Sequence, residues 1–182
     1  MMAGLPSSGS HVLLLAGLKP QVGATTVLLN LAAAGAMQAK RRVLVMDAQT
    51  RRPTVATRLG ITPELGMLDV VAGQAALEHT VLKTSIPALH VLPLTHSHAD
   101  ATLTPEAAAW LLGRLRERFG VILIDGPTLQ DPAALAVLAP VCDALFLVAP
   151  HGETTSLPRD VLQTIARLGG KLRGLLHTQF EM

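Results

Sequence analysis

The sequence predicts an α/β fold, a doubly wound and mainly parallel β-sheet with helices on both faces. Short apolar runs recur along the chain, and segments rich in helix-forming residues separate them. The runs are apolar throughout and do not alternate with polar residues. Strands of this kind are typical of a parallel sheet covered on both faces, and right-handed crossovers then make the sheet doubly wound.

The expected strands are short, and two of them end on a carboxylate. They comprise residues 11–17, 42–47, 89–94, 121–125, 144–149 and 174–178. The second ends at Asp47 and the fourth at Asp125. Ligands bind at the carboxyl ends of the strands in open α/β sheets, so both carboxylates are expected at a binding edge.

Four longer segments between these strands are expected to be helices. They comprise residues 25–38, 105–118, 132–138 and 157–168. The Leu- and Ala-rich residues 28–37 are expected to pack on the core, and Trp110 is expected to be packed as well. The polar residues 95–104 predict an exposed loop.

Length and composition predict one globular domain. We expect residues 1–10 to be a disordered leader and residues 11–182 to form a single domain of ordinary size. Hydrophobic residues make up 49% of the chain and charged residues 15%, which excludes a disordered protein. The net charge is only +2 and the basic residues are scattered, so no nucleic-acid partner is expected.

Further features predict a cytoplasmic location. The single cysteine, Cys142, cannot form an intramolecular disulfide, which favours a reducing compartment. Residues 1–10 lack the charged start, apolar stretch and cleavage site of a signal peptide. Pro140 and Asp143 interrupt the most apolar stretch, residues 133–150, so no direct membrane span is expected.

The loop after the first strand carries a partial phosphate-binding motif. Residues 17–26 read GLKPQVGATT, close to the pattern G-x-x-x-x-G-K-[ST]. In that pattern, backbone N–H groups and a helix N-terminus cradle phosphates, the lysine neutralises them, and the hydroxyl holds Mg²⁺. Gly23 and Thr25 fit the pattern, whereas Leu18 stands at the first glycine and Ala24 at the lysine.

The loop and the two strand-end carboxylates together predict a site for nucleotide phosphates and Mg²⁺. The metal would be held by Thr25, Asp47 and Asp125, and the two aspartates are the candidate catalytic residues if any activity remains. The nucleotide-binding candidates are Lys19, Pro20, Gln21, Val22, Gly23, Ala24, Thr25 and Thr26. The alternative is that the turn only caps a packing helix and that the aspartates cap helices or begin turns.

Longer segments resemble the bacterial tyrosine kinases of exopolysaccharide export. Residues 19–26 (KPQVGATT) and 43–53 (VLVMDAQTRRP) are similar to that family's motifs P-G-E-G-K-[ST] and hhhDADxRRP. Residues 66–73 (GMLDVVAG), 91–93 (VLP) and 119–127 (FGVILIDGP) resemble its segments GLSDVLAG, VLP and FDxVIIDTPP in the same order. The wider resemblance is to the MinD/ParA-type deviant Walker ATPases, and it spans about residues 11–178.

This resemblance implies a P-loop NTPase fold of the MinD/ParA type, with ATP or ADP and Mg²⁺ as cofactors. It implies a membrane polysaccharide co-polymerase or synthase component as partner, with the chain at the inner face of the cell membrane. Lys19 stands where MinD/ParA-type proteins keep a signature lysine that reaches a nucleotide across a dimer.

Three departures from the family predict impaired catalysis. Ala24 stands at the position of the phosphate-binding lysine, and loss of such a charge lowers rates by about 10²-fold or more. Gln49 replaces the second aspartate of the hhhDAD motif, and the chain contains no tyrosine. The resulting hypothesis is a degenerate, pseudokinase-like regulatory or scaffolding component of exopolysaccharide synthesis or export.

Two alternatives stay open. The first is a weak MinD/ParA-type ATPase switch, with Lys19 supplying the charge and homodimerisation on ATP as its output. The second is a nucleotide-free interaction module akin to the MinD-like proteins of cellulose secretion.

Overall fold

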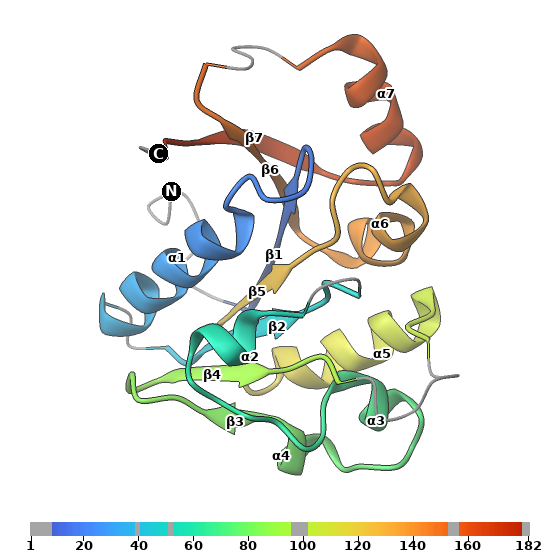
Figure 1. Cartoon of the computed structure of the whole chain (residues 1–182). Coiled ribbons are helices and arrows are strands. Elements are labelled where there is room, and N and C mark those ends of the chain that lie inside the picture. The colour runs from blue at the N-terminus through green and yellow to red at the C-terminus, as the bar shows by residue number, and fades with distance from the viewer. Residues whose placement is uncertain (1–8, 39–40, 51–52, 96–101, 153–156, 180–182) are drawn as a thin grey trace.

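A single mixed sheet forms the centre of the molecule (Figure 1). The computed structural model describes residues 9–38, 41–50, 53–95, 102–152 and 157–179. Within these residues the sheet has seven strands in the order β3-β4-β2-β5-β1-β6-β7, with β3 antiparallel to β4 and the other pairs parallel. The strands are β1 (His11–Gly17), β2 (Val43–Asp47), β3 (Leu82–Lys83), β4 (Leu89–Leu92), β5 (Val121–Asp125), β6 (Ala144–Pro150) and β7 (Leu172–Thr178).

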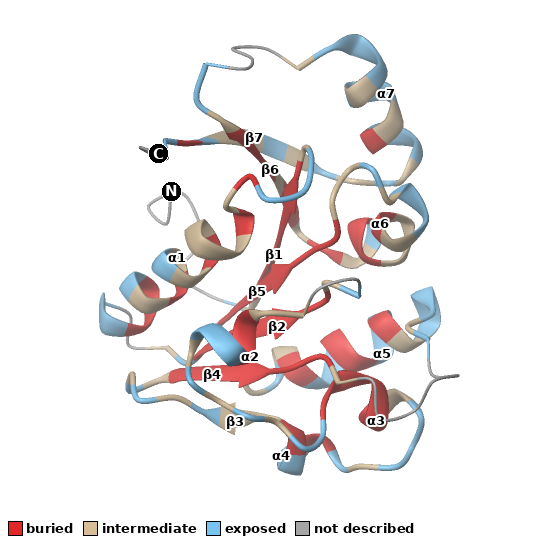
Figure 2. Cartoon of the chain, viewed as in Figure 1, coloured by how far each residue is buried: buried red, intermediate tan, exposed pale blue. Residues whose placement is uncertain are grey.

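Helices cover both faces of this sheet, which confirms the predicted doubly wound α/β fold (Figure 1). The helices are α1 (Ala24–Gln38), α2 (Val55–Arg58), α3 (Met67–Val71), α4 (Leu77–Thr80), α5 (Pro105–Arg116), α6 (Pro132–Leu138) and α7 (Arg159–Arg167). Side chains of α1 and α2 pack on one face, and side chains of α3 to α7 pack on the other. The central strands are therefore buried on both sides, as their uninterrupted apolar sequence requires (Figure 2).

Local signals explain where two of the helices begin. The Thr104 hydroxyl accepts a hydrogen bond from the Ala107 N–H at the start of α5, and the Asp131 carboxylate accepts one from the Ala134 N–H at the start of α6. A proline follows each cap as the first helical residue, where its missing N–H costs nothing.

Several expectations about the fold need correction. Met37 was expected to pack on the core but is exposed, and the strand expected at residues 89–94 and the helix expected at residues 105–118 end earlier, at Leu92 and Arg116. The short helices α2, α3 and α4 and the two-residue strand β3 were not expected from the apolar pattern. The helix expected at residues 157–168 is shorter and spans Arg159–Arg167. Trp110 was expected to be packed, but 53% of its surface is exposed, because the buried side of α5 is formed by Ala108, Leu111, Leu112 and Leu115.

Several expectations fall on parts of the chain that the structure does not describe. Of the leader expected at residues 1–10, residues 1–8 lie outside the described part, and so does the middle of the loop expected at residues 95–104. Ser10 is described, and its hydroxyl donates a hydrogen bond to the Phe119 carbonyl at 2.7 Å. None of the described helices is long and apolar enough to cross a bilayer.

Candidate nucleotide-phosphate site

The loop between β1 and α1 is folded tightly back over the end of its strand. A Cβ atom at Gly17 would lie 2.8 Å from the Lys19 carbonyl oxygen and 2.9 Å from a Val22 methyl carbon, so only glycine fits there. Gly23, directly before α1, has a φ of 81°, a conformation that favours glycine. The N-terminal N–H groups of α1 therefore follow a close-fitting loop, the arrangement that proteins use to bind phosphate.

The last strand helps to hold this loop in place. The Thr178 hydroxyl of β7 donates to the carbonyl oxygen of Val22 at 2.7 Å. The same hydroxyl lies 3.2 Å from the Ala149 carbonyl of β6, and Thr178 is buried. The middle of the loop is thus tied to the opposite end of the chain.

The two predicted carboxylates lie side by side beneath the loop. Asp47 and Asp125 are register partners on the parallel strands β2 and β5, and both are almost completely buried. The Thr25 hydroxyl, in the first turn of α1, donates to Asp125 Oδ2 at 2.7 Å. The structure therefore brings Thr25 together with Asp125, and places Asp47 in the neighbouring strand position.

Asp47 also fixes the start of the segment that follows β2. Its Oδ1 accepts a hydrogen bond from the Gln49 N–H at 3.0 Å, and its Oδ2 accepts one from the Val55 N–H at 3.1 Å. The first residue of α2 is thereby attached to the floor of the site. The Gln49 amide reaches across and donates to the Gly126 carbonyl.

Asp125 is held in an environment that disfavours its charge. Burial raises its pKa from 3.8 to about 7, and the nearby Asp47 carboxylate acts in the same direction. The hydrogen bond from Thr25 and the Gln49 amide act in the opposite direction, as does the positive charge of Arg58. Within the described residues Asp125 Oδ1 has no hydrogen-bond partner, so one oxygen of this buried carboxyl group is unpaired beneath Thr25.

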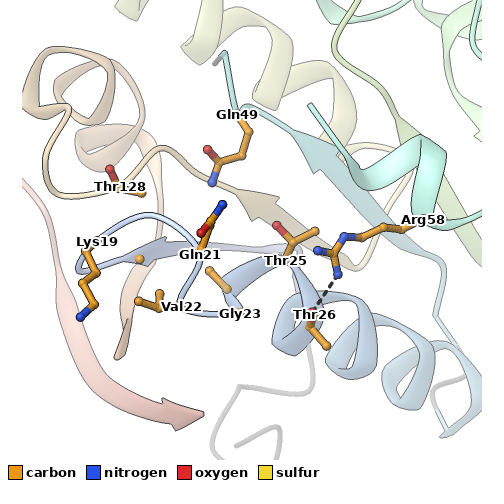
Figure 3. Close-up of a pocket in the computed structure, with 11 residues that line it drawn as sticks. Lys19, Gln21, Val22, Gly23, Thr25, Thr26, Gln49, Arg58 and Thr128 are labelled. Carbon is orange, nitrogen blue, oxygen red and sulfur yellow. Dashed lines mark hydrogen bonds between the residues drawn. The ribbon is translucent and has the colours of Figure 1, made fainter. Parts of the chain in front are cut away.

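A cavity of about 370 Å³ lies over the loop (Figure 3). Most of the predicted nucleotide-binding residues line it: Lys19, Gln21, Val22, Gly23, Ala24, Thr25 and Thr26, together with Gly17, Gln49, Arg58 and Thr128. Pro20 lines a second cavity of about 460 Å³, which shares Gln21, Thr25, Gln49, Arg58 and Thr128 with the first. Asp47 and Asp125 line neither cavity, because they are buried beneath Thr25.

Two residues of this lining were missed in the sequence. Arg58 reaches the cavity from the end of α2, and its Nη1 donates to the Thr26 hydroxyl at 2.8 Å. Thr128 comes from the loop after β5. Thr128 could have been predicted from the sequence, because it lies three residues after Asp125 at the end of an expected strand. No motif indicates Arg58.

Two acidic residues after β5, Asp131 and Asp143, form contacts that hold the fold together. Asp131 caps α6 and also lines the second cavity. Asp143 accepts two hydrogen bonds from the Arg116 guanidinium, each at 2.9 Å, and one from the Val12 N–H at 2.7 Å. Residues 51 and 52 of the RRP motif lie outside the described part of the chain.

The site residues fit a nucleotide with Mg²⁺ at all but two positions. The loop N–H groups would hold the phosphates, and the Thr25 hydroxyl with the carboxyl groups of Asp47 and Asp125 would hold the metal through oxygen ligands of the type that Mg²⁺ prefers. In the described part of the chain, no group of three or more His, Cys, Asp or Glu residues lies close enough for a metal, so phosphate oxygens and water would complete the coordination. The misfits are Ala24, which brings no cation, and Gln49, which stands where the resembled motif has a carboxylate.

Comparison with solved structures identifies the fold. The chain superposes on MinD of Pyrococcus horikoshii complexed with Mg-ADP with a TM-score of 0.74 at 22% identity, covering 91% of this chain and 69% of that chain. It superposes on the kinase domain of VpsO with a TM-score of 0.81 at 27% identity, covering 94% and 86%. The fold is therefore that of a MinD-like P-loop NTPase.

Sequence comparison finds relatives with similar sequences among bacterial proteins. The chain is 29% identical over 181 residues to the putative tyrosine-protein kinase EpsB of Ralstonia nicotianae, covering 98% of this chain and 23% of that protein. It is 27% identical over 188 residues to the succinoglycan biosynthesis transport protein ExoP of Rhizobium meliloti, covering 100% and 23%. The chain is thus similar in sequence to a putative bacterial tyrosine-protein kinase and to a polysaccharide transport protein, which confirms the resemblance seen in the motifs.

The sequence similarity covers only part of the length of these relatives. The chain spans about a quarter of the length of these curated relatives. No protein-family model matches it.

Proposed function

We propose that this chain is a catalytically impaired regulatory or scaffolding component of exopolysaccharide synthesis or export, which binds ATP or ADP with Mg²⁺ but does not phosphorylate tyrosine. The observation that carries the proposal is the state of the phosphate loop. The loop keeps its tight turn and the Thr25–Asp125 hydrogen bond, yet the first residue of α1 is Ala24 where the motif requires lysine. Binding and catalysis are thereby separated.

Binding and catalysis can be separated because they require positive charge to different extents. Backbone N–H groups and a helix N-terminus stabilise a bound phosphate in the ground state. The lysine of the motif places a positive charge next to the negative charge that develops in the transition state. Loss of one such group lowers the rate by about 10²–10³-fold. Gln49 stands where the resembled motif has a second aspartate near the metal, so a carboxylate is lost there. The chain also contains no tyrosine that could accept a phosphoryl group.

Calorimetry and turnover measurements on one preparation test the proposal. We expect measurable binding of Mg-ATP or Mg-ADP, together with ATP turnover at least about 10²-fold below that of an intact relative's kinase domain. Restoring both lost groups, with Ala24→Lys and Gln49→Asp, should raise turnover. Turnover of the unmodified chain at the rate of an intact relative would refute the proposal, whereas absence of any heat would favour the nucleotide-free scaffold.

The ATPase-switch alternative rests on a specific residue. Lys19 lines the same cavity as Thr25, at the far side of the loop from α2 (Figure 3). If it acts across a dimer, Lys19→Ala abolishes dimerisation that depends on ATP. An unchanged oligomeric state with and without ATP, measured by light scattering, removes the basis of this alternative.

We also propose that the chain works at the cytoplasmic face of the membrane with a polysaccharide co-polymerase or synthase component. The motivation is that ExoP is named a succinoglycan biosynthesis transport protein. Site-specific crosslinking in cells, from exposed positions of this chain to a membrane polysaccharide co-polymerase of the same organism, tests this. A polysaccharide yield that is unchanged when the gene is deleted would contradict the proposal.

A further inference from the structure

Resting on the proposed nucleotide binding, we propose that Arg58 supplies the phosphate-binding cation that this chain lacks at position 24. The positive charge is carried by a residue of α2, which lies on the opposite side of the cavity from Lys19. In the motif the charge is carried by a residue in the first turn of α1. The ligand of Arg58 is the polyphosphate of a nucleoside di- or triphosphate.

The position of Arg58 is the first support. Its side chain lines both cavities over the phosphate loop, as do Thr25 and Gln49, so it stands where the two cavities meet. Figure 3 shows the guanidinium extending from α2 toward the first turn of α1, with Lys19 at the other end of the lining. A phosphate held by the loop N–H groups would therefore lie within the region that Arg58 faces.

The side chain is also held ready for an anion. Its Nη1 donates to the Thr26 hydroxyl at 2.8 Å, which uses one of the five N–H donors of a guanidinium. The planar fork of arginine matches phosphate oxygens in a bidentate manner, which the ammonium of lysine cannot do. The hydrogen bond to Thr26 thus orients the Arg58 guanidinium and leaves other N–H groups able to bind a ligand.

The helix that carries Arg58 is anchored to the site itself. The Val55 N–H, at the start of α2, donates to the buried Asp47 carboxylate at 3.1 Å. Three residues later, at the end of this four-residue helix, Arg58 leaves toward the loop. Asp47, one of the predicted metal ligands, therefore fixes the start of the helix that carries the Arg58 guanidinium.

One further observation supports a ligand in this place. Asp125 Oδ1 is fully buried and has no hydrogen-bond partner among the described residues. The other oxygen of the same carboxyl group accepts a hydrogen bond from the Thr25 hydroxyl, and Thr25 lines both cavities together with Arg58.

Binding measurements on Arg58 variants test this inference. The probes are Mg-ATP, Mg-ADP and inorganic tripolyphosphate with Mg²⁺, titrated by calorimetry. Arg58→Gln, which removes the charge and keeps polar atoms near Thr26, should weaken all three probes by about 10- to 100-fold, as expected for loss of a charge-assisted hydrogen bond. Arg58→Lys should retain more affinity than Arg58→Gln, and the loss should shrink at high salt.

Two controls separate this role from a structural one. Arg159→Gln removes an exposed arginine from the start of α7 and should leave all affinities unchanged. Thr26→Val removes the hydrogen-bond partner but keeps the charge, so it should lower affinity less than Arg58→Gln. Circular dichroism and thermal unfolding establish that each variant is folded.

A double-mutant cycle with position 24 gives the sharpest test. If Arg58 stands in for the missing lysine, then Ala24→Lys restores affinity by about tenfold in the Arg58→Gln background and by clearly less in the unmodified chain. Equal gains in both backgrounds would overturn the inference, as would affinities that Arg58→Gln leaves unchanged.

These results also separate the inference from the proposed function. Binding by the unmodified chain without kinase activity, combined with an unaffected Arg58→Gln variant, refutes only the role of Arg58. Turnover at the rate of intact relatives that falls in Arg58→Gln refutes the impaired function and supports Arg58. An unmodified chain that binds none of the three probes overturns the inference together with the nucleotide-binding part of the proposed function.

Discussion

Replacing Asp125 by Asn should change how the stability of the chain depends on pH. Asp125 is fully buried, and its pKa rises from 3.8 to about 7 because burial disfavours the charged form. Between these values the folded chain holds a proton on Asp125 that the unfolded chain has released. The unfolded state then binds fewer protons, so the free energy of unfolding decreases as the pH rises through this window and is flat above it.

The interval between the two pKa values sets the size of this effect. One pKa unit corresponds to 1.36 kcal/mol, so the window from 3.8 to about 7 corresponds to roughly 4 kcal/mol as an upper value. Asn cannot ionise and keeps a similar shape. The Asp125→Asn variant should therefore gain up to roughly 4 kcal/mol relative to the unmodified chain between pH 4 and pH 7.5.

Urea unfolding at half-unit steps from pH 4.5 to pH 8 measures this difference. Asp160→Asn, on the exposed start of α7, is the matched control for the change in net charge. Its stability curve should run parallel to that of the unmodified chain. If the Asp125→Asn curve also runs parallel over the whole range, the carboxyl is not held in the neutral form and the reasoning fails.

Three further substitutions test separate parts of the structure. Thr178→Val should destabilise the chain by about 1 kcal/mol and speed hydrogen exchange in the phosphate loop, because the Val22 carbonyl loses its donor; unchanged exchange in the loop would contradict this. Gly126→Ala would place a Cβ atom closer to a Leu14 methyl carbon than two carbon atoms can approach and should lower the stability by about 1–3 kcal/mol in thermal unfolding, so an unaltered Tm would show that the strand end is loosely packed. Arg116→Gln should cost about 1 kcal/mol at pH 7, since its pair with Asp143 is partly exposed. Although burial alone would raise the pKa of Asp143, the Arg116 guanidinium and a backbone N–H lower it, so this cost should shrink as the pH falls below about 4; a cost that stays constant down to pH 3 would argue against the ion pair.

Much of the fold follows from the sequence because burial leaves a clear pattern. Strands that are buried on both faces must be apolar throughout, so β1, β2 and β5 could be recognised without periodicity. The phosphate loop could be recognised because its turn requires glycine at position 23. The position of Asp47 beside Asp125 follows from the rule that parallel strands open onto one edge.

Other features depend on tertiary contacts that leave no local signal. The place of Arg58 is set by a four-residue helix whose start is bound to a buried carboxylate, which no propensity encodes. β3 has only two residues and pairs antiparallel at the sheet edge. Trp110 was misjudged although the pattern was available, since Ala108, Leu111 and Leu115 form a stripe at helical spacing and position 110 falls beside it.

The link from Thr178 to the phosphate loop has a consequence for the order in which the molecule matures. The carbonyl oxygen of Val22 in the loop is bound by a hydroxyl that lies 156 residues further along the chain. During synthesis a domain generally folds as a unit. Strand β1, the loop and α1 therefore leave the ribosome well before β7, and the loop gains its final support for binding an anion only after β7 has emerged.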